Sequence, residues 1–199
     1  IMVQSFLHVS RDPGPWLIRA LDWCEDQGEK ITPFAFCDKL EMIDSEILEG
    51  KALPVLDKMV FGNVSHYWFY RLDYELWKAY QNRGGEETVD GIWTSLRKEA
   101  TELVKGFQFR KCGSVEHINP RNPKEGEADP TVNFFGNLAL ISGSRNSAFS
   151  NETRVGKQQL ILDSKYTESL KMVHFLWCNE DTVDVGEKMY SLLVNSLKL

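Results

Sequence analysis

The sequence has no long hydrophobic run and no targeting signal of a known kind. No window reaches the roughly 18 uninterrupted apolar residues that a membrane helix needs. A positively charged start followed by an apolar stretch and a small-residue cleavage site is also missing. We therefore expect a soluble, cytoplasmic protein that does not bind membranes.

Closely spaced cysteines are missing as well. The four cysteines lie too far apart for a CxxC redox motif or for the ligand spacing of a zinc knuckle. We interpret them as free and mostly buried thiols: Cys24, Cys37, Cys112 and Cys178.

The chain lacks an excess of basic charge. It carries 23 Lys and Arg against 29 Asp and Glu, which gives a net charge of −6. All of that excess lies in residues 1–100, where 17 acidic residues face 11 basic ones. Such a balance argues against binding nucleic acid by bulk electrostatics, although a contact over a few phosphates remains compatible with it. The acidic first half suggests contact with another domain or protomer.

The first part of the chain carries the apolar spacing of amphipathic helices. Four segments are expected to be helical: residues 13–28, 32–50, 65–81 and 86–105. Their apolar stripes predict a helical bundle over residues 1–106.

After Gly106 the pattern changes to short extended stretches. A polar loop is expected over 119–131, a buried strand over 134–141 and a turn at 142–144. A polar, partly helical stretch follows over 145–162, and helices are expected over 164–178 and 181–197. Residues 107–199 thus form a second predicted domain.

Of the four histidines, His117 has the most distinctive surroundings. Glu116 and His117 lie side by side between Val115 and Ile118, which favour a strand, and Pro120 stops that strand at once. A site that used both side chains would need them at the frayed strand end, because neighbouring strand residues point to opposite faces. We interpret the other three as packed or solvated histidines: His8, His66 and His174.

A group of amide and cationic side chains surrounds and follows the predicted strand at 134–141. Asn137 is an amide within an apolar run, so it must find hydrogen-bond partners, and bracing a loop is one use for it. The polar segment behind the strand suits a phosphate: Arg145, Asn146, Asn151, Arg154 and Lys157. An oxygen-only pair of Glu116 and Asn146 fits a hard cation such as Mg²⁺ and would be a poor zinc site.

The order of these motifs resembles the HNH-type C-terminal domain of GmrSD-family restriction endonucleases, within the wider family of His-Me finger nucleases. The resemblance covers about residues 107–176 and includes Val115-Glu116-His117-Ile118-x-Pro120, Gly136-Asn137-Leu138-Ala139-Leu140, Asn146-Ser147 and Ser150-Asn151 with Lys157. It implies a mostly α protein with a small ββα-metal core, preceded by a helical bundle and followed by tail helices. The segment from His66 to Tyr74 is similar to the helical part that precedes this domain.

The resemblance also implies roles for individual residues. His117 would be the general base for the attacking water, and Asn137 would orient the loop or the imidazole. Glu116 and Asn146 would ligate one Mg²⁺ or Mn²⁺ per active site. Lys157, Arg145, Arg154 and Asn151 would hold the nucleic-acid backbone. Asn119 and Arg121 depart from the residues common around the proline, and Val155 stands where an aromatic residue is frequent.

The implied function is that of a metal-dependent DNA endonuclease or nickase in a bacterial anti-phage or modified-DNA restriction system. Relatives of this build carry an N-terminal ParB-like nucleotide-hydrolysing domain, which nothing here matches, so we expect a C-terminal fragment of a larger protein. A double-strand cut by one site would require a homo-oligomer or two visits. Two alternatives stay open: a catalytically silent interaction or DNA-binding platform, and an RNA-directed nuclease.

Overall fold

The computed structural model describes residues 14–28, 31–48, 53–81, 92–93, 97–123, 126–127, 129–178 and 180–197. The chain divides into two compact units, residues 1–53 and 54–199. The predicted domain boundary after residue 106 is a different division of the chain, and it stays a prediction. No helix in the described ranges is long and apolar enough to cross a membrane.

The first unit contains two helices that pack against each other, α2 (Gly14–Gln27) and α3 (Pro33–Leu48). The backbone N–H of Ala35 donates to Oγ1 of Thr32, which caps the start of α3. Both helices were predicted from apolar spacing, and both are confirmed. Their buried apolar side chains are Trp16, Ala20, Leu40 and Ile43.

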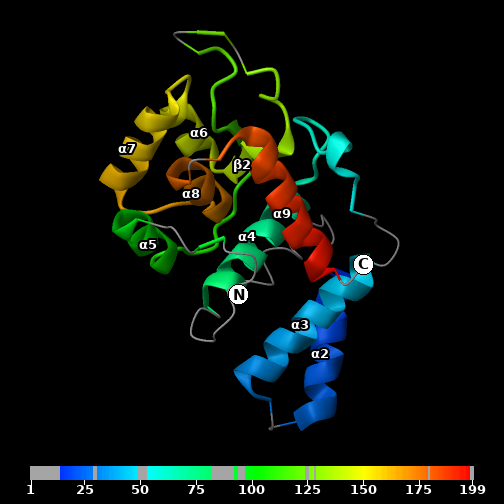
Figure 1. The fold of residues 1–199 in the computed structure, drawn as a ribbon. Coiled ribbons are helices and arrows are strands. Elements are labelled where there is room, and N and C mark those ends of the chain that lie inside the picture. Colours follow the sequence, from blue (N-terminus) through cyan, green and yellow to red (C-terminus); the bar gives the residue numbers. More distant parts are fainter. Residues whose placement is uncertain are drawn as a thin grey trace. The chain divides into compact units, whose positions relative to one another are not determined.

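The second unit is mostly helical around a small antiparallel sheet (Figure 1). Its elements in chain order are η2 (Leu56–Lys58), α4 (His66–Gln81), α5 (Lys98–Lys105), β1 (Ser114–His117), η5 (Phe135–Asn137), β2 (Leu138–Ile141), α6 (Gly143–Phe149), α7 (Arg154–Ser164), α8 (Leu170–Trp177) and α9 (Thr182–Ser196).

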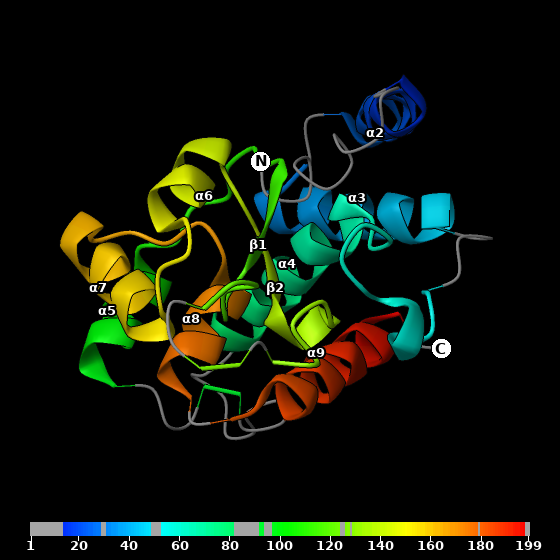
Figure 2. The ribbon, with the colours of Figure 1, turned by 90° about the horizontal axis from the view of Figure 1, so that it is seen from above.

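The sheet consists of β1 and β2, and the register pairs Ser114 with Ile141 and His117 with Leu138. All four residues of β2 are apolar and buried, so both faces of this strand need cover. Helices α4 and α8 contact β2, and α6 contacts β1 (Figure 2). The end of β1 that carries His117 is thereby held against a rigid frame.

A buried pair of titratable side chains, Asp73 and Lys171, ties the helices to the turn before β2. Asp73 of α4 accepts hydrogen bonds from Ser169 Oγ at 3.2 Å and from the backbone N–H of Lys171 at 3.0 Å. The ammonium of Lys171 in α8 donates to the carbonyls of Phe135 and Leu138, the latter at 2.6 Å. Burial raises the pKa of Asp73 to about 7 and lowers that of Lys171. These contacts fix η5, which contains Asn137.

Helix α9 approaches η5 so closely that only glycine fits at the contact. A Cβ on Gly136 would lie 1.8 Å from the carbonyl oxygen of Thr182 and 2.8 Å from the backbone nitrogen of Gly186. On the other side of this contact, a Cβ on Gly186 would lie 2.4 Å from Cε1 of Phe134. Two glycines therefore set the distance between α9 and the segment that leads into β2.

Several sequence predictions of helix need correction. The prediction of a helix over 86–105 is wrong in part. Ile92 and Trp93 form a turn, and among the described residues of this segment helix is found only at Lys98–Lys105. Residues 82–91 and 94–96 lie outside the described ranges. The helix expected over 164–178 begins only at Leu170. Lys165 has a left-handed backbone that ends α7, and Ser169 caps α8 through its hydroxyl.

The predicted strand and turn also shift. The strand expected over 134–141 is found only over Leu138–Ile141, because Phe135–Asn137 forms a 3-10 turn. The turn expected at 142–144 is the start of α6, capped by Ser142. The expectation of mostly buried cysteines is wrong. Cys112 is buried, Cys24 and Cys178 are half-buried, and Cys37 is exposed.

Candidate functional site

One pocket lies where β1 ends and α6 passes beside it. It has a volume of about 260 Å³ and brings together four residues singled out from the sequence, Glu116, His117, Asn146 and Asn151. The rest of its lining comes from β1 itself, from the segment after β1, from the C-terminal end of α6 and from the region before α4. These residues are Phe61, Val115, Pro120, Arg121, Asn122 and Ser150.

The buried amide of Asn137 shapes the chain at the pocket. Its Oδ1 accepts from the backbone N–H of Asn119 at 2.7 Å, and its Nδ2 donates to the carbonyls of Asn119 at 3.0 Å and Val132 at 2.8 Å. The backbone N–H of Ile118 also donates to the carbonyl of Asn137 at 2.8 Å. These bonds hold the segment that leaves β1 to the turn before β2. Asn137 thus braces the loop, while the imidazole has a different partner.

That partner is Asn133. Nε2 of His117 lies 3.0 Å from Oδ1 of Asn133, so Nε2 carries the proton and Nδ1 keeps its lone pair. The ring also packs against Phe61, with ring centroids 4.5 Å apart. Burial lowers the pKa of His117; the bond to Asn133 acts in the opposite direction, and the positive charge of Arg121 adds to the lowering. The imidazole is therefore neutral at neutral pH and able to accept a proton.

Glu116 is paired with the buried ammonium of Lys157. Oε1 of Glu116 lies 2.6 Å from Nζ of Lys157, which also donates to the carbonyls of His117 at 2.6 Å and Ile118 at 3.1 Å. Burial raises the pKa of Glu116 and lowers that of Lys157, and the contact between them opposes both shifts. The side chain of Lys157 is fully buried. The predicted contact of Lys157 with a backbone phosphate is thus not available in this structure.

Asn146 reaches the pocket from α6. Ser142 caps this helix by accepting from the backbone N–H of Arg145, and Asn146 follows one position later. Ser150 ends the helix with φ of 42° and ψ of −129°, a conformation that a non-glycine residue rarely adopts. Backbone strain of this kind concentrates at functional sites. Asn151 follows directly and lines the same pocket.

Arg145 and Arg154, two residues predicted to contact nucleic acid, lie outside the pocket. The guanidinium of Arg145 donates to Oγ of Ser164 and stacks on the ring of Tyr166, 4.3 Å from its centroid. Arg154 donates to the carbonyls of Phe175 and Cys178 near the end of α8. Both guanidinium groups are engaged within the protein, and neither residue lines the pocket.

The sequence reasoning missed two residues that matter here. Asn133 lies 16 residues from His117, in a polar loop with no motif of its own, so no signal in the sequence identifies it. Arg121 is exposed, lines the pocket and lies over the ring of Phe61, with 5.5 Å between Cζ and the ring centroid. A basic residue directly behind the histidine and proline was the signal that could have found it.

Donor chemistry decides what the pocket could hold. Besides the imidazole and the guanidinium, it offers the carboxylate of Glu116, the carboxamides of Asn122, Asn146 and Asn151 and the hydroxyl of Ser150. Oxygen donors of this kind fit Mg²⁺ or Mn²⁺. Because Lys157 occupies Oε1 of Glu116, a cation would be held through Oε2.

Comparison with known proteins identifies the family. The family model described as "GmrSD restriction endonucleases, C-terminal domain" matches residues 56–191, which is most of the chain. No curated protein and no solved structure matches the chain. The matched region contains both strands, α6 and every residue of the pocket. Membership implies a function related to restriction endonucleases and suggests nuclease activity. The chain belongs to the GmrSD restriction endonuclease family, through the C-terminal domain of its members.

Proposed function

We propose that this chain is the nuclease domain of a restriction system and hydrolyses phosphodiester bonds of DNA. The observation that carries the proposal is the pocket that joins a neutral, oriented His117 to Glu116 and Asn146. The chain order β1, β2, α6, with residues of β1 and α6 at this pocket, supports a His-Me finger core of HNH type.

His117 acts as the general base. Oδ1 of Asn133 accepts a hydrogen bond from Nε2–H of His117, so Nδ1 is the atom that accepts a proton from the attacking water. Burial keeps the imidazole in the basic form at neutral pH. Asn137 keeps the strand end in place through its bonds to Asn119 and Val132.

Glu116 and Asn146 hold one Mg²⁺ or Mn²⁺. When bound, the cation stabilises the charge that develops on the phosphate and on the leaving oxygen. Glu116 supplies the one carboxylate of this donor set, and Asn146 supplies a neutral oxygen from α6. The ammonium of Lys157 positions Glu116 and offsets part of its charge.

Arg121 and Asn151, at the same pocket, contact the phosphate backbone of the substrate. Because the chain has a net charge of −6, its binding of DNA depends on such local contacts and on the rest of the protein. We assign the chain to a larger cytoplasmic protein whose ParB-like nucleotide-hydrolysing domain recognises phage or modified DNA. An RNA substrate would use the same chemistry.

The proposal is tested with supercoiled plasmid. We expect the chain to convert it to nicked or linear product with Mg²⁺ or Mn²⁺ but not with EDTA. His117→Ala should abolish cutting while thermal unfolding and DNA affinity stay nearly unchanged. Cutting that persists in the variant would remove His117 as the base.

One observation favours a second candidate function. The ammonium of Lys157 lies 2.6 Å from Glu116, the carboxylate proposed to hold the metal, and a fixed positive charge there opposes a cation. If the complete protein binds DNA but does not cut it with any divalent ion, the chain is a catalytically silent platform. Asn146→Ala separates the two functions, since only a nuclease should need more Mg²⁺ after this change.

A further inference from the structure

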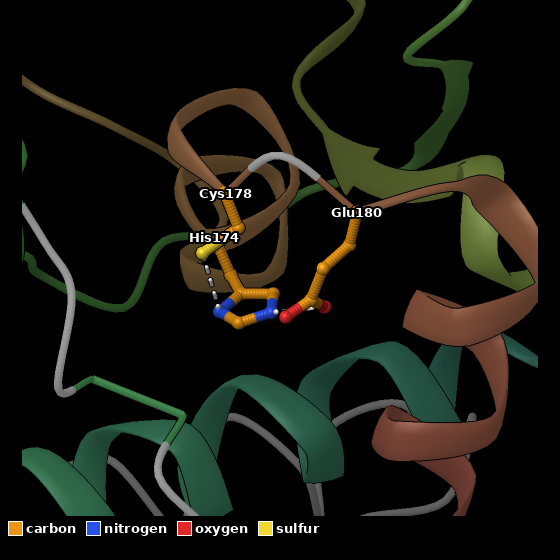
Figure 3. Close-up of side chains that lie close together, drawn as sticks. All are labelled: His174, Cys178 and Glu180. Atoms are coloured by element: carbon orange, nitrogen blue, oxygen red, sulfur yellow. Dashed lines mark hydrogen bonds and ion pairs between the residues drawn. The ribbon is translucent and has the colours of Figure 1, made fainter.

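Three side chains with metal-binding atoms meet at the end of α8, outside the nuclease pocket. His174 belongs to α8, Cys178 follows the helix and Glu180 comes just before α9 (Figure 3). One donor atom from each lies within 4.8 Å of the other two. Among the described residues, this is the group of three or more His, Cys, Asp and Glu side chains close enough to share an ion.

The contacts of His174 place an oxygen acceptor beside each ring nitrogen and the thiol of Cys178 beside one of them. The carbonyl of Ile92 lies 3.2 Å from Nδ1, and Oε2 of Glu180 lies 3.3 Å from Nε2, so an oxygen acceptor faces each nitrogen. Sγ of Cys178 lies 3.5 Å from Nδ1, on the same ring (Figure 3). A neutral imidazole has one N–H and can serve only one of them. If Nδ1–H donates to Ile92, the lone pair of Nε2 faces the carboxylate. A lone pair and a carboxylate oxygen repel each other. A cation between these two atoms would be coordinated by both and would remove the repulsion.

The distances and surroundings agree with such a cation. Two donors about 2.0 Å from a tetrahedral ion lie about 3.3 Å apart, which is the separation of Nε2 and Oε2. Ligating histidines commonly donate their other N–H to a carbonyl, as Nδ1 does here to Ile92. Lys188 binds the second carboxylate oxygen, Oε1, and so orients Glu180.

Access and donor type narrow the choice of ion. The imidazole is 1% exposed, whereas Glu180 is 26% exposed and Cys178 is half-buried, so solvent reaches the group from one side. Thiolate, imidazole and carboxylate together suit Zn²⁺, while Mg²⁺ prefers oxygen donors alone. The solvent side leaves room for water as a fourth ligand.

We propose that His174, Cys178 and Glu180 form a Zn²⁺ site that ties the end of α8 to the start of α9. The site is separate from the oxygen-rich nuclease pocket, and its existence does not depend on the proposed nuclease activity. Binding of Zn²⁺ to the folded state alone stabilises this junction. Arg154 of α7 donates to the carbonyls of Phe175 and Cys178, so a third helix meets at the same place.

The test is titration of the metal-free chain with Co²⁺, which takes the place of Zn²⁺ and reports thiolate ligation by a near-ultraviolet charge-transfer band. We expect one equivalent of Co²⁺ to produce the band and Zn²⁺ to remove it. Cys178→Ser should abolish the band, and Glu180→Gln should weaken metal binding by about tenfold or more. Zn²⁺ should raise the melting temperature of the wild type but not that of Cys178→Ser.

Matched controls exclude other sites. Cys37→Ser removes an exposed thiol and should leave the band unchanged. Glu116→Gln alters the nuclease pocket and should also retain it, so a failure of the nuclease proposal would not affect this result. Absence of a band with the wild type, or a band that survives in Cys178→Ser, overturns the zinc site. The cluster would then be a group of hydrogen-bonded side chains without a metal ion.

Discussion

His117 depends on Asn133 for its orientation and for its tautomer. The 3.0 Å bond from Nε2 to Oδ1 of Asn133 joins the strand end to the loop before η5. Phe61 packs on one side of the ring and fixes its plane. A general base needs its free nitrogen aimed at the water, so Asn133 is a positioning residue for the proposed reaction.

Removal of this bond should slow turnover more than it affects stability. Asn133 is exposed, so Asn133→Ala leaves little buried surface uncovered. We expect kcat to fall by roughly 10- to 100-fold with little change in melting temperature, because the imidazole loses the partner that fixes its tautomer. Plasmid cleavage at saturating metal measures the effect, and Asn122→Ala in the same pocket is the matched control.

The conservative variant Asn133→Asp makes the role of Asn133 testable through pH. Burial lowers the pKa of His117 below its ordinary value of 6.5, so wild-type activity should be lost only as the pH falls through a midpoint below 6.5. Aspartate keeps an acceptor on Nε2 but adds negative charge, which raises the pKa of the imidazole. The midpoint of the rate profile should therefore move upward. An unchanged midpoint, or full activity in Asn133→Ala, would contradict the assignment.

At the scale of elements, Lys157 joins α7 to the end of β1. Its ammonium binds the carboxylate of Glu116 and the carbonyls of His117 and Ile118. The sequence predicted a phosphate contact for this residue. The two roles differ in what the lysine stabilises, the folded protein or the complex with DNA.

Lys157→Met should therefore destabilise the protein by about 3–5 kcal/mol, because a buried carboxylate and two carbonyls lose their partner. Urea unfolding measures the change, and Lys111→Met at an exposed position is the control. The double variant with Glu116→Gln should be more stable than the sum of the single effects predicts. Unchanged stability with weaker DNA binding would instead support the phosphate contact.

The contact of α9 with η5 gives a second prediction for an element. Gly136→Ala would force a methyl group against the carbonyl of Thr182, and backbone cannot move aside as a flexible side chain can. We expect a loss of about 1–3 kcal/mol or more, measured by thermal or urea unfolding. Gly143→Ala is the control, since its Cβ would meet nothing within 4 Å. Equal stability of the two variants would show that α9 can shift.

Elements with their own apolar spacing could be predicted from the sequence, and those set by contacts from distant residues could not. Periodicity found α2 and α3 because each buries few positions along one side. It also found α4 from its apolar spacing, although that helix is buried on all sides from Trp68 to Leu76. The start of α8 could not be found in this way, since the hydroxyl of its capping residue Ser169 also binds Asp73, 96 residues away. The turn at Ile92 and Trp93 depends similarly on contacts with Leu76 and His174.

The same distinction holds for the candidate site. The motif around His117 and the polar segment behind the strand identified Glu116, His117 and Asn146, and these three line one pocket because β1 and α6 are neighbours. Long cationic side chains, in contrast, can point in many directions. Composition could not show that Lys157 and Arg154 turn inward onto carbonyls.

For the second unit as a whole, the buried pair of Asp73 and Lys171 connects α4, α8 and the turn that leads into β2. Asp73 contacts Ser169 and the backbone of Lys171, and Lys171 contacts the carbonyls of Phe135 and Leu138. These contacts span nearly 100 residues of sequence. The protonation state of Asp73 therefore bears on the stability of the entire unit.

Stability should depend on pH through this carboxyl group. Its pKa is about 7 in the folded protein against an ordinary 3.8, so the folded state holds the proton more tightly. The stabilisation is complete below about pH 4 and is lost as the pH rises to about 7, by up to about 1.4 kcal/mol per pH unit. A carboxamide cannot titrate, so the advantage of the wild type over Asp73→Asn should shrink over this range and then level off. Urea unfolding from about pH 4.5 to about pH 8 measures the difference in unfolding free energy between the two proteins. Asp57→Asn, at an exposed position, is the control. A difference that does not change with pH would show that Asp73 stays ionised.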